Sequence, residues 1–178
     1  MAVTLKETEA TPAAYPAAPG NLSPAAAALD AAPIWQRIEA YCRMRWTLRE
    51  VVWTVEGGDA WEPPLSPANV TEIEVWENGS WVRCTPAASP WGDYELPGFA
   101  YRVTAEVGSG DVPAVVSEAF RRLAEYLADE PDRSAASSFS HAVPGVLEET
   151  YERNPAWIAR AMELSGAADL LRPYKRRA

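Results

Sequence analysis

One stretch of the chain decides the fold: Val70-Thr-Glu-Ile-Glu-Val-Trp-Glu-Asn-Gly-Ser-Trp-Val-Arg-Cys84. Its first half alternates, with Ile73 and Val75 on one face and glutamates on the other. Asn78-Gly79 follows, and this dipeptide favours a two-residue type I′ turn because both positions take positive φ. The stretch therefore predicts two antiparallel strands joined by a tight hairpin, with the second strand at Ser80–Cys84.

Two further stretches on either side of the hairpin show the same period of two. Arg49–Glu56 places Val51, Trp53 and Val55 on one face, and Tyr101–Val107 alternates apolar with polar residues throughout. A short strand is also expected within Trp91–Leu96. Because strict alternation is typical of half-buried strands, these segments predict a small antiparallel sheet.

Helical periodicity brackets the sheet. One helix is predicted over about residues 33–45 and another over about 113–129, each with an apolar stripe opposed by charged residues. Asp111 is the expected N-cap of the second helix. The predicted fold class is therefore α+β: a small antiparallel sheet packed with these helices, plus an extended N-terminal arm and a C-terminal helical arm.

Four segments are expected along the chain. Residues 1–32 form an Ala/Pro-rich N-terminal arm, 33–130 the α+β core, 131–153 a linker or long loop, and 154–178 a C-terminal helix with a basic tail. The N-terminal arm is either a disordered tail or a segment that orders against a neighbouring subunit. Ser23 and Pro24 are suited to cap and start a short helix within it.

The composition narrows the class of protein. The chain has 178 residues, with 25 acidic and 16 basic side chains and a net charge of −9. This acidic balance argues against general binding to nucleic acid or to anionic membrane. No apolar run approaches the roughly 20 residues that span a bilayer. With two cysteines and no signal-like start, we expect a soluble protein of a reducing compartment.

No catalytic, cofactor or metal site is predicted. The single histidine, His141, lies in a serine-rich stretch without a nucleophile elbow. Gly108-Ser-Gly-Asp111 lacks the Gly-Lys-Ser/Thr ending of a phosphate loop. Cys42 lies on the apolar face of the first helix and is expected in the core. We therefore expect a protein that is not an enzyme.

Tryptophan is abundant, with eight residues. Six fall in the sheet region: Trp46, Trp53, Trp61, Trp76, Trp81 and Trp91. Core packing and a subunit interface are the favoured explanation, since aromatic residues concentrate in both. An exposed aromatic face that binds sugars or stacks bases is the alternative.

The last 25 residues combine an apolar helical stripe with a basic end. Trp157, Ala161, Leu164 and Leu171 share one helical face, which needs a partner surface. Gly166 interrupts the predicted helix and either serves close packing or marks a break. The basic residues that follow are either a solubilising tail or an arm that meets an acidic pocket or phosphate.

Three stretches together resemble the head–tail connector (adaptor, or head completion) proteins of long-tailed bacteriophages and gene transfer agents. They are Ile38–Trp46 running into Arg49–Trp53, then Val112–Leu127, and finally Asn154–Ala161 with Ser165–Tyr174 and its basic end. The third stretch is the most specific of the three. The N-terminal region departs from the family, because many relatives have two clear helices before the sheet.

The resemblance implies a structural protein of the virion neck. Such adaptors form a ring of copies, usually twelve, below the portal protein, where they line the channel for DNA ejection and present a platform for a stopper or tail-completion protein. Genomic DNA would pass without sequence-specific binding, and the location would be the head–tail interface of the virion, with the host cytoplasm during assembly. The C-terminal arm would dock on the portal through Trp157, Ile158, Ala161, Leu164, Gly166, Leu170, Leu171, Arg172, Tyr174, Lys175, Arg176 and Arg177.

Two other functions stay open from the sequence. One is a stopper or tail-completion protein of the same neck. The other is an aromatic-rich module that binds polysaccharide or single-stranded nucleic acid. Exposure of several tryptophans on one sheet face would favour the second.

Overall fold

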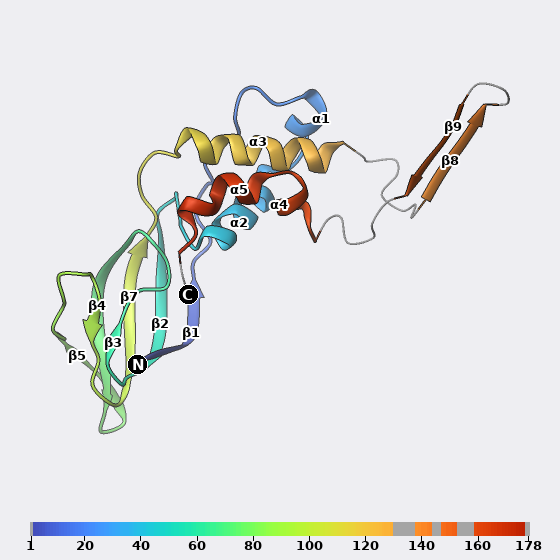
Figure 1. The fold of residues 1–178 in the computed structure, drawn as a ribbon. Coiled ribbons are helices and arrows are strands. Elements are labelled where there is room, and N and C mark those ends of the chain that lie inside the picture. The colour runs from blue at the N-terminus through green and yellow to red at the C-terminus, as the bar shows by residue number, and fades with distance from the viewer. Residues whose placement is uncertain (1, 130–137, 144–146, 153–158, 177–178) are drawn as a thin grey trace. The chain divides into compact units, whose positions relative to one another are not determined.

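The computed structural model describes residues 2–129, 138–143, 147–152 and 159–176. The class is α+β with a small antiparallel sheet, as predicted (Figure 1). The elements follow the chain in this order: β1 (Val3–Glu9), α1 (Pro24–Ala27), α2 (Ala31–Cys42), β2 (Arg49–Glu56), β3 (Ala60–Trp61), β4 (Ala68–Glu77), β5 (Ser80–Cys84), β6 (Tyr94–Glu95), β7 (Ala100–Val107), α3 (Ala114–Ala128), β8 (Ser138–Val143), β9 (Leu147–Glu152), α4 (Ala161–Leu164), α5 (Ala167–Leu171) and a 3-10 turn η1 (Arg172–Tyr174).

The chain divides into two compact units. The sheet unit comprises Met1–Pro16, Cys42–Asp111 and Lys175–Ala178, and the helical unit comprises Ala17–Tyr41 and Val112–Tyr174. This division differs from the four segments expected along the chain, because segments from both ends contribute to the units. Among the described residues, no helix is long and apolar enough to cross a bilayer.

Five strands form the main sheet of the sheet unit, in the order β1-β2-β7-β4-β5 with every neighbouring pair antiparallel. The strands predicted from alternation are confirmed, and so is the hairpin between β4 and β5. Asn78 has φ 50° and Gly79 has φ 82°, both in the left-handed region that a type I′ turn requires. This tight turn therefore fixes the register between β4 and β5.

The two faces of this sheet differ. Alternate residues of β2 and β7 face a core in which Trp53, Val55 and Val103 are fully buried. Trp61 of β3, Leu65 and Leu96 complete that core from outside the main sheet. The opposite face carries mostly charged and polar side chains, together with Trp76 and Trp81 near the β4–β5 hairpin.

The N-terminal residues belong to the main sheet. β1 is an edge strand that pairs antiparallel with β2, with Glu7 opposite Trp53 and a register shift between Thr4 and Lys6. Residues 3–9 are thus extended, as an arm would be, but they order against this chain's own sheet. The two hypotheses of a disordered tail and of an arm on a neighbouring subunit do not hold for this strand. Ser23 caps α1 as predicted, because its Oγ accepts the Ala26 amide at 3.2 Å.

The helical unit is built around α3. Its Phe120 ring packs on Trp35 of α2, with centroids 4.9 Å apart. α2 ends at Cys42 because Arg43 turns into the left-handed region with φ 55°. α3 begins at Ala114 with Pro113 in the N-cap position and without a side-chain cap hydrogen bond. The prediction of Asp111 as N-cap is therefore wrong, since the helix begins too far along the chain for that side chain to cap it.

Two strands lie in the segment that was expected to be a linker or long loop. β8 and β9 pair antiparallel, from Ser138 opposite Glu152 to Val143 opposite Leu147. The loop prediction is wrong for these residues. In β8 the small and polar residues Ser138, Ser140 and Ala142 obscured the period of two that predicts a strand.

Candidate interaction surfaces

The C-terminal segment was the strongest candidate site in the sequence, and the structure divides it. Gly166, with φ 72°, breaks the predicted helix into α4 and α5, so the alternative of a break is the correct one. Three of its small or apolar residues are fully buried: Ala161, Ala167 and Leu171. Trp157, Ile158 and Arg177 lie outside the described residues.

The apolar side of this segment packs within the helical unit. α4 and α5 both contact α3, and the Tyr41 hydroxyl of α2 donates a hydrogen bond to the Ala168 carbonyl at 3.3 Å. Ala161 and Ala167 have the short side chains that permit such close packing. Of the described residues of the expected stripe, Ala161 and Leu171 are therefore covered by the chain itself, and Leu164 is not.

What remains exposed on the segment is mainly charged. Leu164 is 48% exposed, Arg172 and Lys175 are exposed, and Leu170 and Tyr174 are half-buried. These five are the predicted docking residues that can meet a partner without unpacking the helical unit.

Arg176 is anchored in the sheet unit instead. Its guanidinium donates to the carbonyls of Pro63 and Leu65 at 3.1 and 3.3 Å and pairs with Glu62. Burial lowers the pKa of Arg176, and the nearby charge of Arg43 lowers it further. Arg176 thus ties the end of the described chain to the sheet unit rather than reaching outward.

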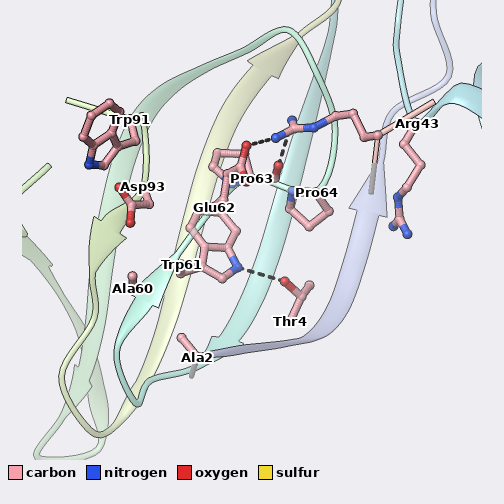
Figure 2. A pocket seen from close by; sticks show the side chains of 11 residues that line it. Ala2, Thr4, Arg43, Ala60, Trp61, Glu62, Pro63, Pro64, Trp91 and Asp93 are labelled. Atoms are coloured by element: carbon pink, nitrogen blue, oxygen red, sulfur yellow. Dashed lines mark hydrogen bonds and ion pairs between the residues drawn. The ribbon is translucent and has the colours of Figure 1, made fainter. Parts of the chain in front are cut away.

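A pocket of about 390 Å³ adjoins this anchor. Figure 2 shows Trp91 and Asp93 toward one end of it and Arg43 toward the other, with Trp61 between them. The Trp61 indole donates to the Thr4 hydroxyl at 2.9 Å. The titratable lining consists of two guanidiniums and two carboxylates, and one of each, Arg176 and Glu62, already pair with each other.

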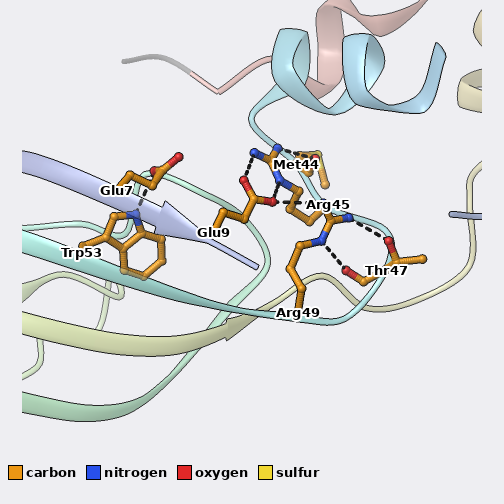
Figure 3. Close-up of polar contacts among 7 residues, drawn as sticks. All are labelled: Glu7, Glu9, Met44, Arg45, Thr47, Arg49 and Trp53. Carbon is orange, nitrogen blue, oxygen red and sulfur yellow. Dashed lines mark hydrogen bonds and ion pairs between the residues drawn. The ribbon is translucent and has the colours of Figure 1, made fainter. Parts of the chain in front are cut away.

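A cluster of charges joins β1 to the rest of the sheet unit (Figure 3). Glu9 accepts from Arg45 Nη2 at 2.7 Å and from Arg49 Nη1 at 3.0 Å, and each arginine is only 7% exposed. Burial raises the pKa of Glu9, but the hydrogen bonds and charges of both arginines outweigh it and leave that pKa lowered. Arg49 also donates to the Thr47 hydroxyl at 2.7 Å and lies over the Tyr15 ring. Since the bonds of this cluster are internal, its role is structural.

The tryptophans divide between the core and the surface. Trp35, Trp46, Trp53 and Trp61 are buried, in line with the core packing that was favoured as an explanation for the high tryptophan count. Trp76 and Trp91 are 44% and 86% exposed. Trp81 is half-buried beside Trp76 on the open face of the sheet, where Arg102 joins them. Arg102 was not among the site residues predicted from the sequence, although its place in an alternating strand put it on the solvent face.

The part of the chain that the structure describes holds no group of three or more His, Cys, Asp or Glu side chains placed to bind a metal ion. Cys42 is buried and Cys84 is half-buried, and these two described cysteines form no disulfide. Burial raises the pKa of the Cys84 thiol, and the negative charges of Glu77 and Glu74 raise it further. A thiol in such surroundings is less reactive than an exposed one.

The fold is similar to that of chains in two solved structures of particle necks. One is the neck of an empty GTA (gene transfer agent) particle computed with C6 symmetry, with a TM-score of 0.51 and 15% identity over 90% of this chain and 95% of that chain. The other is the neck of a native GTA particle computed with C12 symmetry, with a TM-score of 0.50 and 16% identity over 90% and 94%. No protein-family profile matches this chain, and no curated protein matches it. At such identity, the likeness establishes a shared fold.

Proposed function

We propose that this chain is a structural protein of a virion neck: an adaptor that forms a ring, joins the portal to the stopper or tail, and lines the DNA exit channel. The observation that supports this most strongly is the fold likeness to neck chains of gene transfer agent particles, which covers nearly the full length of both chains. Those necks were computed with sixfold and twelvefold symmetry, which fits a ring of copies. The three sequence stretches that resemble head–tail connectors favour the same role.

The charge of the chain fits a channel protein. A net charge of −9 per copy gives a ring of many copies a strongly negative field. Such a wall repels the phosphate backbone, so DNA slides through the channel without being held. Sequence-specific contacts have no part in this role.

The C-terminal segment is the proposed portal-docking element, but only some of the residues expected to contact the portal point outward, and others hold the segment in place. Leu164, Arg172 and Lys175 supply the outward contacts, helped by Leu170 and Tyr174. Ala161 and Leu171 hold the segment on α3, Gly166 sets the bend, and Arg176 anchors its end. Trp157, Ile158 and Arg177 are proposed as further contacts from the sequence alone.

Native mass spectrometry of the full chain mixed with the portal ring of its own particle tests this function. Twelve bound copies are the expected result. Six copies would place the chain later in the neck, as a stopper or tail-completion protein, and no binding to intact portal would overturn the neck role.

A variant pair tests the docking segment. Leu164→Ser together with Lys175→Glu should weaken portal binding at least tenfold, because the first removes an exposed apolar contact and the second sets a like charge against the partner. Leu48→Ser is the matched control, since Leu48 is 61% exposed and lies in the sheet unit. Equal binding by the variant and the control would remove the segment from the portal interface.

A further inference from the structure

Four side chains form a rigid cluster at one corner of the open sheet face, which we call the Trp corner: Glu74, Trp76, Trp81 and Arg102. Trp76 and Trp81 lie opposite each other on β4 and β5, with ring centroids 5.1 Å apart and planes at 64°. Arg102 of β7 lies over the Trp81 ring at 5.0 Å and donates to Glu74 at 2.6 Å. Each member is therefore held by at least one other.

The Trp corner has the character of an interaction hot spot. Trp76 is 44% exposed and the Arg102 side chain 39% exposed, so both can contact a partner. Tryptophan and arginine are the residue types most enriched among the dominant contacts of protein interfaces. Because the cluster is already fixed on strands, little side-chain entropy is lost when a partner binds.

The geometry does not suit a flat ligand. Bases and sugars stack on an open aromatic face, whereas the two indoles here stand edge to face and Arg102 covers one side of Trp81. Glu74 belongs to the cluster, Glu72 lies on the same face of β4, and Glu77 follows Trp76 at the end of that strand, so their charge opposes a polyanion. This arrangement fits a folded protein surface that carries apolar and basic groups.

The opposite edge of the same sheet offers such a surface. β1 exposes Val3 and Leu5, which are 50% and 62% exposed, and Lys6 beside them. Within the described part of the chain, neither Lys6 nor Glu77 has an ion-pair partner. The β1 edge and the corner at the other side of the sheet are thus complementary: β1 is apolar with a free cation, and the corner is aromatic with a free anion at the end of β4.

We propose that, in the ring, the Trp corner of one copy packs against the β1 edge of the next copy. Trp76 contacts Val3 and Leu5, and Glu77 pairs with Lys6. A closed ring of identical copies needs two different patches on each copy, and this sheet presents them at β1 and at the Trp corner on its other side. The inference rests on the proposed ring function, of which it names the contact between neighbouring copies.

The test measures how rings fill on the portal by native mass spectrometry of the full chain. Wild-type protein should give mostly empty portals and complete rings. Trp76→Ala should give partial rings and need at least tenfold more protein for half-filling, because contacts between neighbours make filling cooperative. Trp91→Ala is the control, since Trp91 is more exposed but lies outside the Trp corner.

A charge exchange identifies the partner surface. Lys6→Glu and Glu77→Lys should each produce partial rings, and the double variant should restore complete ones. Complete rings from Trp76→Ala and both single variants would overturn this contact while leaving the neck function intact. Absence of any wild-type ring would overturn the neck function first and this contact with it. Quenching of tryptophan fluorescence by dextran or an oligo-dT strand, abolished by Trp76→Ala, would instead make the Trp corner a ligand site.

Discussion

The two ends of the described chain are held in place by different chemistry. β1 is anchored by polar side chains that reach buried partners: Thr4 to Trp61, Glu7 to Trp53, and Glu9 to Arg45 and Arg49. α4 and α5 are anchored by apolar burial of Ala161, Ala167 and Leu171. One end therefore depends on hydrogen bonds and charge, and the other on packing.

This difference determines what each end shows to solvent. Because the inward positions of β1 are polar, its apolar Val3 and Leu5 are left outside. In α5 the inward positions are apolar, and the charged Arg172 and Lys175 that follow this helix are exposed. An edge strand with outward apolar residues is a surface on which another chain can pack. A charged outer face is stable in water without a partner and suits a partner of opposite charge.

Glu9→Ala should have the largest effect on stability and would break the polar anchor. It leaves two nearly buried guanidiniums without their carboxylate, and removal of one partner from a buried ion cluster costs about 3–5 kcal/mol. Guanidinium chloride unfolding measures the change. Glu50→Ala on β2 is the control, since that exposed glutamate should matter by less than about 0.5 kcal/mol. A loss at Glu9 no larger than at Glu50 would mean that water replaces the carboxylate.

Leu171→Ala tests the apolar anchor. Leu171 is fully buried, so its truncation removes transfer energy and leaves a cavity, at a cost of about 3 kcal/mol. Leu164→Ala, at a side chain that is 48% exposed, should cost less than about 1 kcal/mol. The same unfolding experiment compares the two leucines. Similar losses for both would show that α5 is not held by packing on α3.

The same contrast explains what could be predicted from the sequence. Alternation in Arg49–Glu56 and Tyr101–Val107, together with the Asn78-Gly79 turn, was enough to predict four strands and the pairing of β4 with β5, because each inner face is apolar. The pairings of β7 with β2 and with β4 join segments far apart in the sequence and came only from the structure. β1 escaped prediction because its inward residues are Thr4, Glu7 and Glu9. Their partners lie 36 to 57 residues away in the sequence, so no local pattern reveals them.

The docking surfaces could also be predicted only in part from the sequence. The stripe through Ala161 and Leu171 was recognised correctly as an apolar helical face, but periodicity does not say which surface will cover it. α3 covers it here, so those residues stabilise the fold. Trp76 and Trp81 were noted as members of an aromatic set, and only the strand register separates them from the buried Trp53 and Trp61.

Thr4→Val sharpens the comparison at a single hydrogen bond. Valine keeps the shape of threonine but leaves the buried Trp61 indole N–H without its acceptor, which costs about 1–2 kcal/mol. Thr8→Val is the matched control on the same strand, because Thr8 is exposed. Thermal unfolding of both variants gives the difference. If the two variants melt together, the Thr4 hydroxyl contributes nothing to holding β1.

Glu118→Gln should have the smallest effect on stability. Its pH dependence, compared with that of Glu9→Ala, distinguishes the contribution of an exposed ion pair from that of a buried one. Glu118 of α3 accepts from Arg121 at 2.7 Å and from Arg122 at 3.0 Å, and these bonds lower its pKa from 4.5 to about 2. Its folded pKa lies below the unfolded value, so its contribution to stability is complete above about pH 4.5 and is lost as the pH falls toward 2. The carboxylate is a third exposed, and exposed helical ion pairs contribute only about 0.3–0.5 kcal/mol.

Urea unfolding of wild type and Glu118→Gln at several pH values measures that contribution. The difference between the two proteins should be small at neutral pH and should vanish as the pH falls through this window. The Glu9→Ala difference should also shrink on acidification, since the pKa of Glu9 is lowered too, but from a much larger starting value. If Glu118→Gln instead removed most of the acid sensitivity, the exposed pairs of α3 and not the buried cluster at β1 would set the response of the fold to pH.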